Sequence, residues 1–184
     1  MAVRRIAVAG EPVLRQKARG VNRFDPSLAS LVRDLVDTMR AAPGIGLAAP
    51  QIGVSLRVFV AEISPEDERA VDELDQTGKL YILCNPQIVK AWGEVEGTEG
   101  CLSIPGYVGE VKRAEVVLVR GQNLKGKPMR VKVRGLLARV FQHEIDHLDG
   151  ILFTDRLESL DKLRKLEQPS PPEESVPRPV AAAI

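Results

Sequence analysis

The sequence is poor in several residue types that would point to particular protein classes. It has two histidines, two cysteines, 4% aromatic residues, and a net charge of +1 from 26 basic and 25 acidic residues. The near-zero net charge excludes the broad basic field of a non-specific nucleic-acid binder, and we expect no specific DNA binding. Local basic patches are still compatible with this net charge. No apolar run could span a bilayer, and the first residues lack a signal-peptide hydrophobic region. We therefore expect an intracellular protein without a membrane partner.

Chain length and composition predict one domain followed by a tail. A chain of 184 residues can bury a core without disulfides, and nothing indicates an oxidising compartment for Cys84 and Cys101. We assign the domain to residues 1–166. From residue 167 to 184 the composition shifts to proline, serine, glutamate and alanine, which predicts a disordered tail.

Helices are predicted near both ends of the domain, and strands between them. Asp25 can cap a first helix that has Pro26 at its first position and ends by residues 42–44. An apolar stripe runs along it: Leu28, Leu31, Val32, Leu35, Val36 and Met39. We predict strands over residues 56–61, 80–89, 111–120 and 129–134, a surface insertion of unassigned role over 64–79, and a last helical segment through the leucines at 157, 160, 163 and 166. Strands followed by a helix indicate an α+β fold rather than alternating βαβ units.

Both histidines lie in one short stretch, Gln142 to Gly150, within an H-E-x-x-H pattern. If the stretch is helical, His143 and His147 lie one turn apart on a common face and can bind one metal ion. Glu144 can then reach a water at the metal without being a ligand. Apolar residues at spacings of three and four support a helix, and Gly150 is suited to end it.

A catalytic metal usually has three protein ligands and a water, so one ligand is missing from this motif. Zincin proteases take the third ligand from downstream, where this chain offers carboxylates at Glu158, Glu167, Glu173 and Glu174. Cys101 is the alternative, because a thiolate binds soft or borderline metals strongly. Cys84 lies in an apolar strand pattern and is expected to be a core residue.

Two further segments have compositions suited to a binding cleft. Residues 44–51, Gly-Ile-Gly-Leu-Ala-Ala-Pro-Gln, combine small residues with a terminal amide, which suits either a cleft wall or a simple turn between a helix and a strand. Residues 99–105, Glu-Gly-Cys-Leu-Ser-Ile-Pro, place glycine and proline around Cys101, so an extended segment there can present the sulfur together with free backbone donors.

Together, residues 44–51, 99–105 and 142–150 resemble the three motifs of the peptide deformylase family, in the family's order, and the resemblance extends over roughly residues 1–166. It implies antiparallel β-sheets around a central metal-binding helix, with an N-terminal helix. It also implies a divalent metal held by Cys101, His143 and His147, with Fe(II) as the native ion and zinc, nickel or cobalt as substitutes. The implied reaction removes the formyl group from the N-terminal formylmethionine of new polypeptides and releases formate.

The resemblance also implies roles for individual residues. Glu144 would be the general base and acid, and the Gln51 amide and Leu102 backbone N–H would stabilise the oxyanion. Ile45, Gly46 and Gly100 would pair with the substrate backbone. Leu136 and Val140 share the face of His143 and could either line the methionine pocket or be ordinary core residues. A salt bridge between Glu99 and Arg113 would brace the cysteine loop. N-formylmethionyl nascent peptides are the expected partners, with a transient ribosome contact, in the bacterial cytoplasm.

Two other hypotheses remain open from the sequence. A zincin-type metallopeptidase would need a downstream carboxylate ligand and would not need Cys101. A binding module with a structural metal would need a fourth protein ligand, for which Cys84 is the spare cysteine.

Overall fold

The computed structural model describes residues 2–42, 44–69 and 77–166. Its two α-helices are α1 (Pro26–Ala41) and α2 (Gly135–Leu148). Its strands, in chain order, are β1 (Gly46–Ala48), β2 (Val58–Ala61), β3 (Tyr81–Trp92), β4 (Val95–Cys101), β5 (Ile104–Arg113), β6 (Val116–Gln122), β7 (Pro128–Arg134) and β8 (Leu163–Lys165). Short 3-10 turns lie at Pro12–Arg15, Ala49–Ile52, Phe153–Arg156 and Leu160–Lys162.

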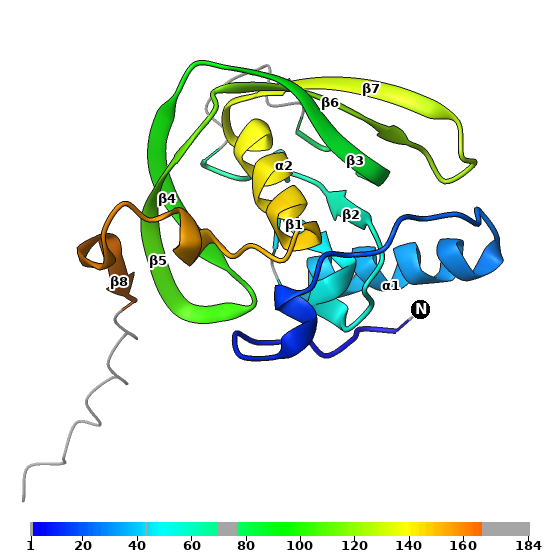
Figure 1. Ribbon diagram of the computed structural model, residues 1–184, viewed down its shortest axis with the longest axis horizontal. Coiled ribbons are helices and arrows are strands. Elements are labelled where there is room, and N and C mark those ends of the chain that lie inside the picture. The colour runs from blue at the N-terminus through cyan, green and yellow to red at the C-terminus, as the bar shows by residue number, and fades with distance from the viewer. Residues whose placement is uncertain (1, 43, 70–76, 167–184) are drawn as a thin grey trace, which may run out of the picture.

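The strands form two antiparallel sheets around α2. One sheet has five strands in the order β1-β2-β3-β6-β7, and the other has three in the order β4-β5-β8. Figure 1 shows α2 at the centre of the molecule, with β3, β6 and β7 arching over it and β4 and β5 along one side. The predicted α+β fold with a central helix and an N-terminal helix is therefore confirmed. No helix among the described residues is long and apolar enough to cross a membrane.

Helix α1 begins and ends where the sequence predicts, and α2 ends where the sequence predicts. The Asp25 side chain accepts hydrogen bonds from the backbone N–H groups of Ser27 and Leu28, which caps the start of α1. Gly150 follows the end of α2 with a φ of +76°, a conformation that favours glycine. A side chain there would also lie 2.8 Å from the Arg15 backbone, so glycine is required on both counts.

The apolar face of α2 packs into the main hydrophobic core. Phe141, which is fully buried, makes edge-to-face contacts with Phe59 of β2 and Tyr81 of β3 at centroid distances of 5.1 and 5.3 Å. Packing α2 against β1, β2 and β7 fixes the helix, and with it the opposite face that carries the histidines. A second cluster packs α1 against the other side of β1 and β2.

Several local predictions were wrong. The predicted strand over residues 111–120 is divided between β5 and β6, which belong to different sheets, because the chain changes sheets at Ala114 and Glu115. No glycine or proline interrupts residues 111–120, so the sequence does not mark this corner. The predicted last helix is instead a 3-10 turn followed by β8, which pairs with Tyr107 to Gly109 of β5.

The residues around Cys101 form the end of β4 and the start of β5.

Two predictions fall partly or wholly outside the described residues. Residues 70–76 of the predicted insertion and the whole predicted tail, 167–184, are not described. In the described parts of the insertion the chain forms turns, with Asp67 and Arg69 paired at 2.6 Å, and there is no helix in those parts.

Candidate metal centre

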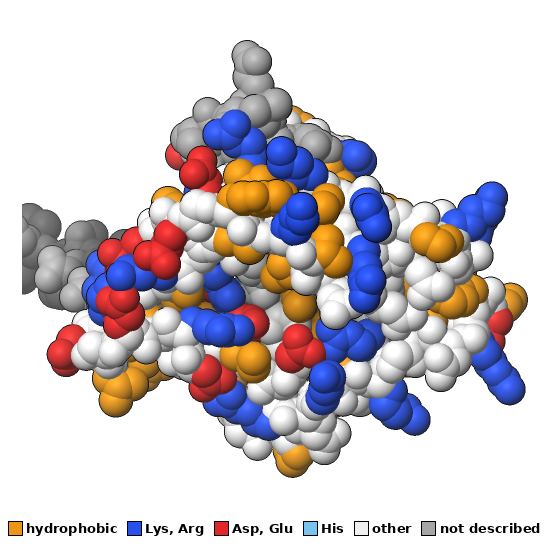
Figure 2. Space-filling model, turned by 45° about the horizontal axis from the view of Figure 1, so that its top comes forward, with side chains coloured by type: hydrophobic (Ala, Val, Ile, Leu, Met, Phe, Trp, Pro, Cys, Tyr) orange, Lys and Arg blue, Asp and Glu red, His pale blue; other side chains and the backbone are white. Residues whose placement is uncertain are grey.

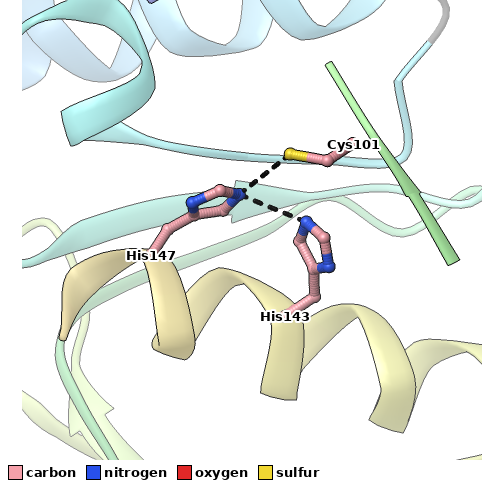
Figure 3. A group of neighbouring side chains, drawn as sticks. All are labelled: Cys101, His143 and His147. Atoms are coloured by element: carbon pink, nitrogen blue, oxygen red, sulfur yellow. Dashed lines mark hydrogen bonds between the residues drawn. The ribbon is translucent and has the colours of Figure 1, made fainter. Parts of the chain in front are cut away.

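Three potential metal ligands converge between α2 and the end of β4. The Nε2 atoms of His143 and His147 lie 3.2 Å apart, and the Cys101 Sγ lies 3.2 Å from His147 Nε2. All three ligand atoms lie within 4.8 Å of one another. Figure 3 shows the two imidazoles rising from consecutive turns of α2 towards the sulfur, which enters from the opposite side.

This geometry fits a single divalent ion. Bond lengths of about 2.0–2.3 Å in a tetrahedral arrangement place ligand atoms roughly 3.3–3.6 Å apart, close to the two distances of 3.2 Å found here. The donor set of one thiolate and two imidazoles suits zinc or another first-row transition metal. Three protein ligands leave one position for water or substrate, as in catalytic rather than structural sites.

Glu99 orients the first histidine. Its Oε2 atom lies 3.0 Å from His143 Nδ1, so that nitrogen can donate its proton while Nε2 faces the metal position. Burial would lower the pKa of His143, but contacts with Cys101 and Glu99 outweigh it and raise the pKa well above the usual value. Burial instead lowers the pKa of His147, next to His143.

Glu99 is itself held by arginines. Arg113 contacts both carboxylate oxygens at 2.8 and 3.0 Å, and Arg139 contacts one at 2.8 Å. The Glu99–Arg113 salt bridge that the resemblance implied is thus present, and both side chains are buried. Burial alone would raise the pKa of Glu99, but hydrogen bonds from His143 and Arg113 lower it far below its ordinary value. Glu99 is consequently an anion that fixes His143.

The network continues on the other side of Arg113. Asp146, also on α2, lies 2.5 Å from Arg113 and 2.6 Å from Arg156. A chain of alternating charges therefore runs from Arg156 through Asp146, Arg113 and Glu99 to His143. Paired and hydrogen-bonded in this way, the buried charges hold β4, β5 and α2 in one arrangement.

Glu144 lies beside the metal position but lacks such partners. It is 3% exposed, and its Oε2 atom has no hydrogen-bond partner among the described residues. Burial raises the pKa of Glu144 to about 7. A methyl group on Gly46 would lie 2.4 Å from Glu144 Oε1, so the absence of a side chain at Gly46 provides the space for this carboxylate.

Gln51 approaches the centre from the turn after β1. Its Oε1 atom accepts a hydrogen bond from the backbone N–H of Ala48 at 2.8 Å, so the amide nitrogen points towards the cysteine loop. There Nε2 lies 3.2 Å from Ser103 Oγ and 3.7 Å from Cys101 Sγ. Leu102 follows the cysteine in the turn between β4 and β5. These two residues thus lie beside the metal position, and their roles remain predictions.

A cleft of about 380 Å³ opens over the metal position. The residues proposed from sequence to bind or act on substrate all line it: Ile45, Gly46, Gln51, Gly100, Leu102, Leu136, Val140 and Glu144. Cys101 and His143 also reach it, together with the more exposed Tyr107, Arg69 and Leu166 near its rim. Three segments distant in sequence therefore form one cavity.

The alternative ligands that lie within the described residues do not join the centre. Cys84 is fully buried in β3, and burial raises its pKa to about 11, as expected for a core residue. Glu158 instead pairs at the surface with Lys112 and Lys162. The other downstream carboxylates, Glu167, Glu173 and Glu174, lie outside the described residues.

Four residues of the site were missed from the sequence: Ser103, Arg139, Asp146 and Arg156. Two have a signal that could have identified them, because Asp146 lies inside the histidine motif and Arg139 lies one helical turn before His143. Ser103 donates its backbone N–H to Cys101 Sγ at 3.4 Å, a contact that depends on the turn geometry. Arg156 comes from a separate turn, and no sequence pattern points to it.

Comparison with known proteins agrees with this geometry. Residues 3–163 match the family described as polypeptide deformylase. A peptide deformylase of Thermomicrobium roseum is 54% identical over 164 residues, covering 89% of this chain and 91% of the relative. A second relative, from Dehalococcoides mccartyi, is 48% identical over 166 residues, covering 90% and 93% of the two chains.

Solved structures show the same fold. The crystal structure of the Thermus thermophilus peptide deformylase superposes with a TM-score of 0.75 at 47% identity, covering 85% of this chain and 86% of that one. A structure from Acinetobacter baumannii, described as Met-Ala-Ser bound, gives a TM-score of 0.79 at 34% identity and covers 85% and 99%.

Proposed function

The chain belongs to the peptide deformylase family and is a metal-binding hydrolase. We propose that its reaction takes place at the centre formed by Cys101, His143 and His147. The residues that act there are Glu144, Gln51 and Leu102. The reaction hydrolyses the formyl amide at the N-terminus of formylmethionyl peptides and yields formate and a free amine. The observation that carries this proposal is the placement of an unpaired, buried Glu144 directly beside three metal ligands in an open cleft. The zincin-type alternative has no support among the described residues, where no downstream carboxylate joins the ligands.

A divalent ion bound here would act as a Lewis acid and would make water more acidic. Glu144 accepts the proton of the attacking water, and its pKa of about 7 lets the same carboxylate hold that proton. As the C–N bond of the formyl amide breaks, Glu144 delivers the proton to the departing amine. Its lack of a competing partner leaves the carboxylate free for both transfers.

Gln51 and Leu102 stabilise the charge that develops on the formyl oxygen. The Gln51 side chain is 2% exposed and is held by Ala48, so its N–H group is already aimed at the centre before substrate binds. The Leu102 backbone N–H adds a second donor from the cysteine turn. Preorganised donors of this kind each contribute on the order of a hundredfold to a thousandfold in rate.

The cleft also suits the proposed substrate. Leu136 and Val140 provide an apolar wall for the methionine side chain, and Ile45, Gly46 and Gly100 offer backbone groups for strand-like pairing with the peptide. The Met-Ala-Ser ligand of the A. baumannii relative supports a cleft that accepts a peptide beginning with methionine.

We further propose Fe(II) as the native ion, with zinc, nickel or cobalt able to replace it. A thiolate and two imidazoles bind all of these ions. The ion that fills the site therefore depends on which metal is available in the cell and not on the geometry of the ligands. New formylmethionyl chains are made in the bacterial cytoplasm, and we place the enzyme there, in transient contact with the ribosome.

Formate release from an N-formylmethionyl tripeptide tests the function. Protein prepared anaerobically is loaded separately with iron, nickel or zinc, and the same peptide without the formyl group is assayed for internal cleavage. We expect formate release with at least one metal and no cleavage of the control peptide. Cleavage of the control without formate release would reject the deformylase mechanism in favour of a peptidase.

A further inference from the structure

Basic residues are concentrated in one part of a chain that is nearly neutral overall. Residues 116–134 contain six lysines and arginines and no acidic residue, whereas the whole chain has a net charge of +1. This stretch is the β6–β7 hairpin. The neighbouring strand β3 also contains no acidic residue and adds Lys90. Three adjacent strands of the five-stranded sheet therefore have only positive charges.

The strand register brings these charges onto one face. Val117, Val119 and Val133 are buried against the core, so the residues that alternate with them point outwards. Arg120 pairs with Arg130, Leu118 with Lys132 and Val116 with Arg134, while Lys90 lies opposite Leu118 on the other side. We call the outward cations Lys90, Arg120, Arg130, Lys132 and Arg134 the basic face. Figure 2 shows many Lys and Arg side chains over this part of the surface.

Few carboxylates neutralise the basic face. Arg134 lies 3.6 Å from Glu115, and among the described residues no ion pair is formed by Lys90, Arg120, Arg130 or Lys132. Some surface cations elsewhere, such as Arg40 and Lys112, pair with glutamates instead. Lys90, Arg120, Arg130 and Lys132 thus retain their charge for an external partner.

Two features favour a nucleic acid as that partner. Trp92 is 45% exposed beside the cations, with Lys132 Nζ 5.6 Å from its ring centroid, and an exposed aromatic ring can stack on an unpaired base. At the other end of the face, Arg120, Arg130 and Gln122 border a hollow of about 400 Å³ that can receive a phosphate group. A membrane surface would favour several exposed apolar side chains for insertion, whereas the exposed large apolar residues on β3, β6 and β7 are Val89 and Trp92.

The basic face is separated from the cleft, which is lined mainly by α2, β4, β5 and the residues around β1. The inner surface of β6 and β7 packs on the core around α2, and no member of the basic face lines the cleft. A partner bound to the outer surface would leave the substrate entrance open.

We propose that the basic face binds the phosphate backbone of RNA. The inference rests on the proposed function, because a deformylase meets its substrates where nascent chains leave the RNA-rich ribosome. The basic face would hold the enzyme against RNA while the cleft stays accessible to peptide.

The test measures the affinity for a short, fluorescently labelled RNA hairpin by anisotropy, between about 50 and about 200 mM salt. The test variant is Arg130→Glu with Lys132→Glu. The matched control is Lys17→Glu with Arg33→Glu, which changes the net charge equally at two exposed sites outside the basic face. We expect the test variant to bind at least about tenfold more weakly at low salt and to have a salt slope smaller by about two, because two phosphate contacts are lost. The control should bind as the wild type does.

Three outcomes would overturn the proposal. These are undetectable RNA binding by the wild type, equal losses in test and control variants, and binding to phosphatidylglycerol vesicles without binding to RNA. Arg130→Gln with Lys132→Gln removes the same charges more gently, so it decides the question if the double glutamate variant fails to fold. Formate release from a tripeptide is measured in parallel and should be unchanged in all variants. A wild type that binds RNA but releases no formate would instead count against the proposed function.

Discussion

Helix α2 carries two buried carboxylates, two residues apart, in opposite surroundings. Asp146 is 7% exposed and lies within 2.6 Å of guanidinium groups of both Arg113 and Arg156. Glu144 is 3% exposed, and one of its oxygens has no partner among the described residues. Burying an unpaired carboxylate is costly, whereas a paired one is stabilised by its partners. The helix thus holds one carboxylate for structure and leaves the other available for proton transfer.

The difference follows from which side of α2 each residue faces. Asp146 points to β5 and the turn at Phe153–Arg156, which supply the two arginines. Glu144 points to the cleft, where Gly46 makes room for it without offering a side-chain donor. Removing the charge should therefore have different effects at the two positions.

The largest effect is expected from Glu144→Gln. A neutral amide of the same shape cannot accept the water proton, so kcat should fall by up to about 10⁴-fold. Metal content, measured by elemental analysis, should stay at the wild-type level because Glu144 is not a ligand. Near-normal turnover in this variant would reject Glu144 as the base.

The matched change Asp146→Asn should instead act on stability. It leaves Arg113 buried with Glu99 as its remaining partner, so the cost should be at most the about 3–5 kcal/mol that is typical when a buried charge loses its partner. We expect a clear fall in the free energy of unfolding, measured with urea. Glu144→Gln should not destabilise the protein, since it removes an unpaired buried carboxylate. Equal destabilisation by both variants would contradict the proposed division of roles.

A smaller effect is expected from pH, through the paired carboxylate Glu99. Its hydrogen bonds with His143 and Arg113 hold its pKa below the ordinary value of 4.5. The stabilisation by Glu99 is therefore complete above about pH 4.5 and is lost as the pH falls through the depressed pKa. In metal-free protein, Tm should fall more steeply below that pH for the wild type than for Glu99→Gln. Parallel pH profiles would show that Glu99 is not held as an anion.

The sequence predicted those parts of the site that depend on local spacing. His143 and His147 are four residues apart on one helix, and Asp25 and Gly150 mark helix ends through their own backbone and side-chain chemistry. The convergence of Cys101 with these histidines came from the family resemblance, because spacing within a chain cannot show which distant segment approaches a helix.

What could not be predicted depends on how the sheets divide. No glycine or proline marks the change of sheets at Ala114 within residues 111–120, so the corner was missed. The pairing of β8 with β5 was missed because a short strand at a sheet edge has too few residues to show a pattern. Arg156 reaches Asp146 only through this tertiary arrangement.

X-ray absorption spectroscopy of the metal-loaded protein tests the metal centre most directly. We expect one sulfur and two imidazole nitrogens around the ion, with the sulfur contribution absent in Cys101→Ala. A spectrum of the wild type that contains only nitrogen and oxygen ligands would contradict the Cys101–His143–His147 centre and the mechanism built on it.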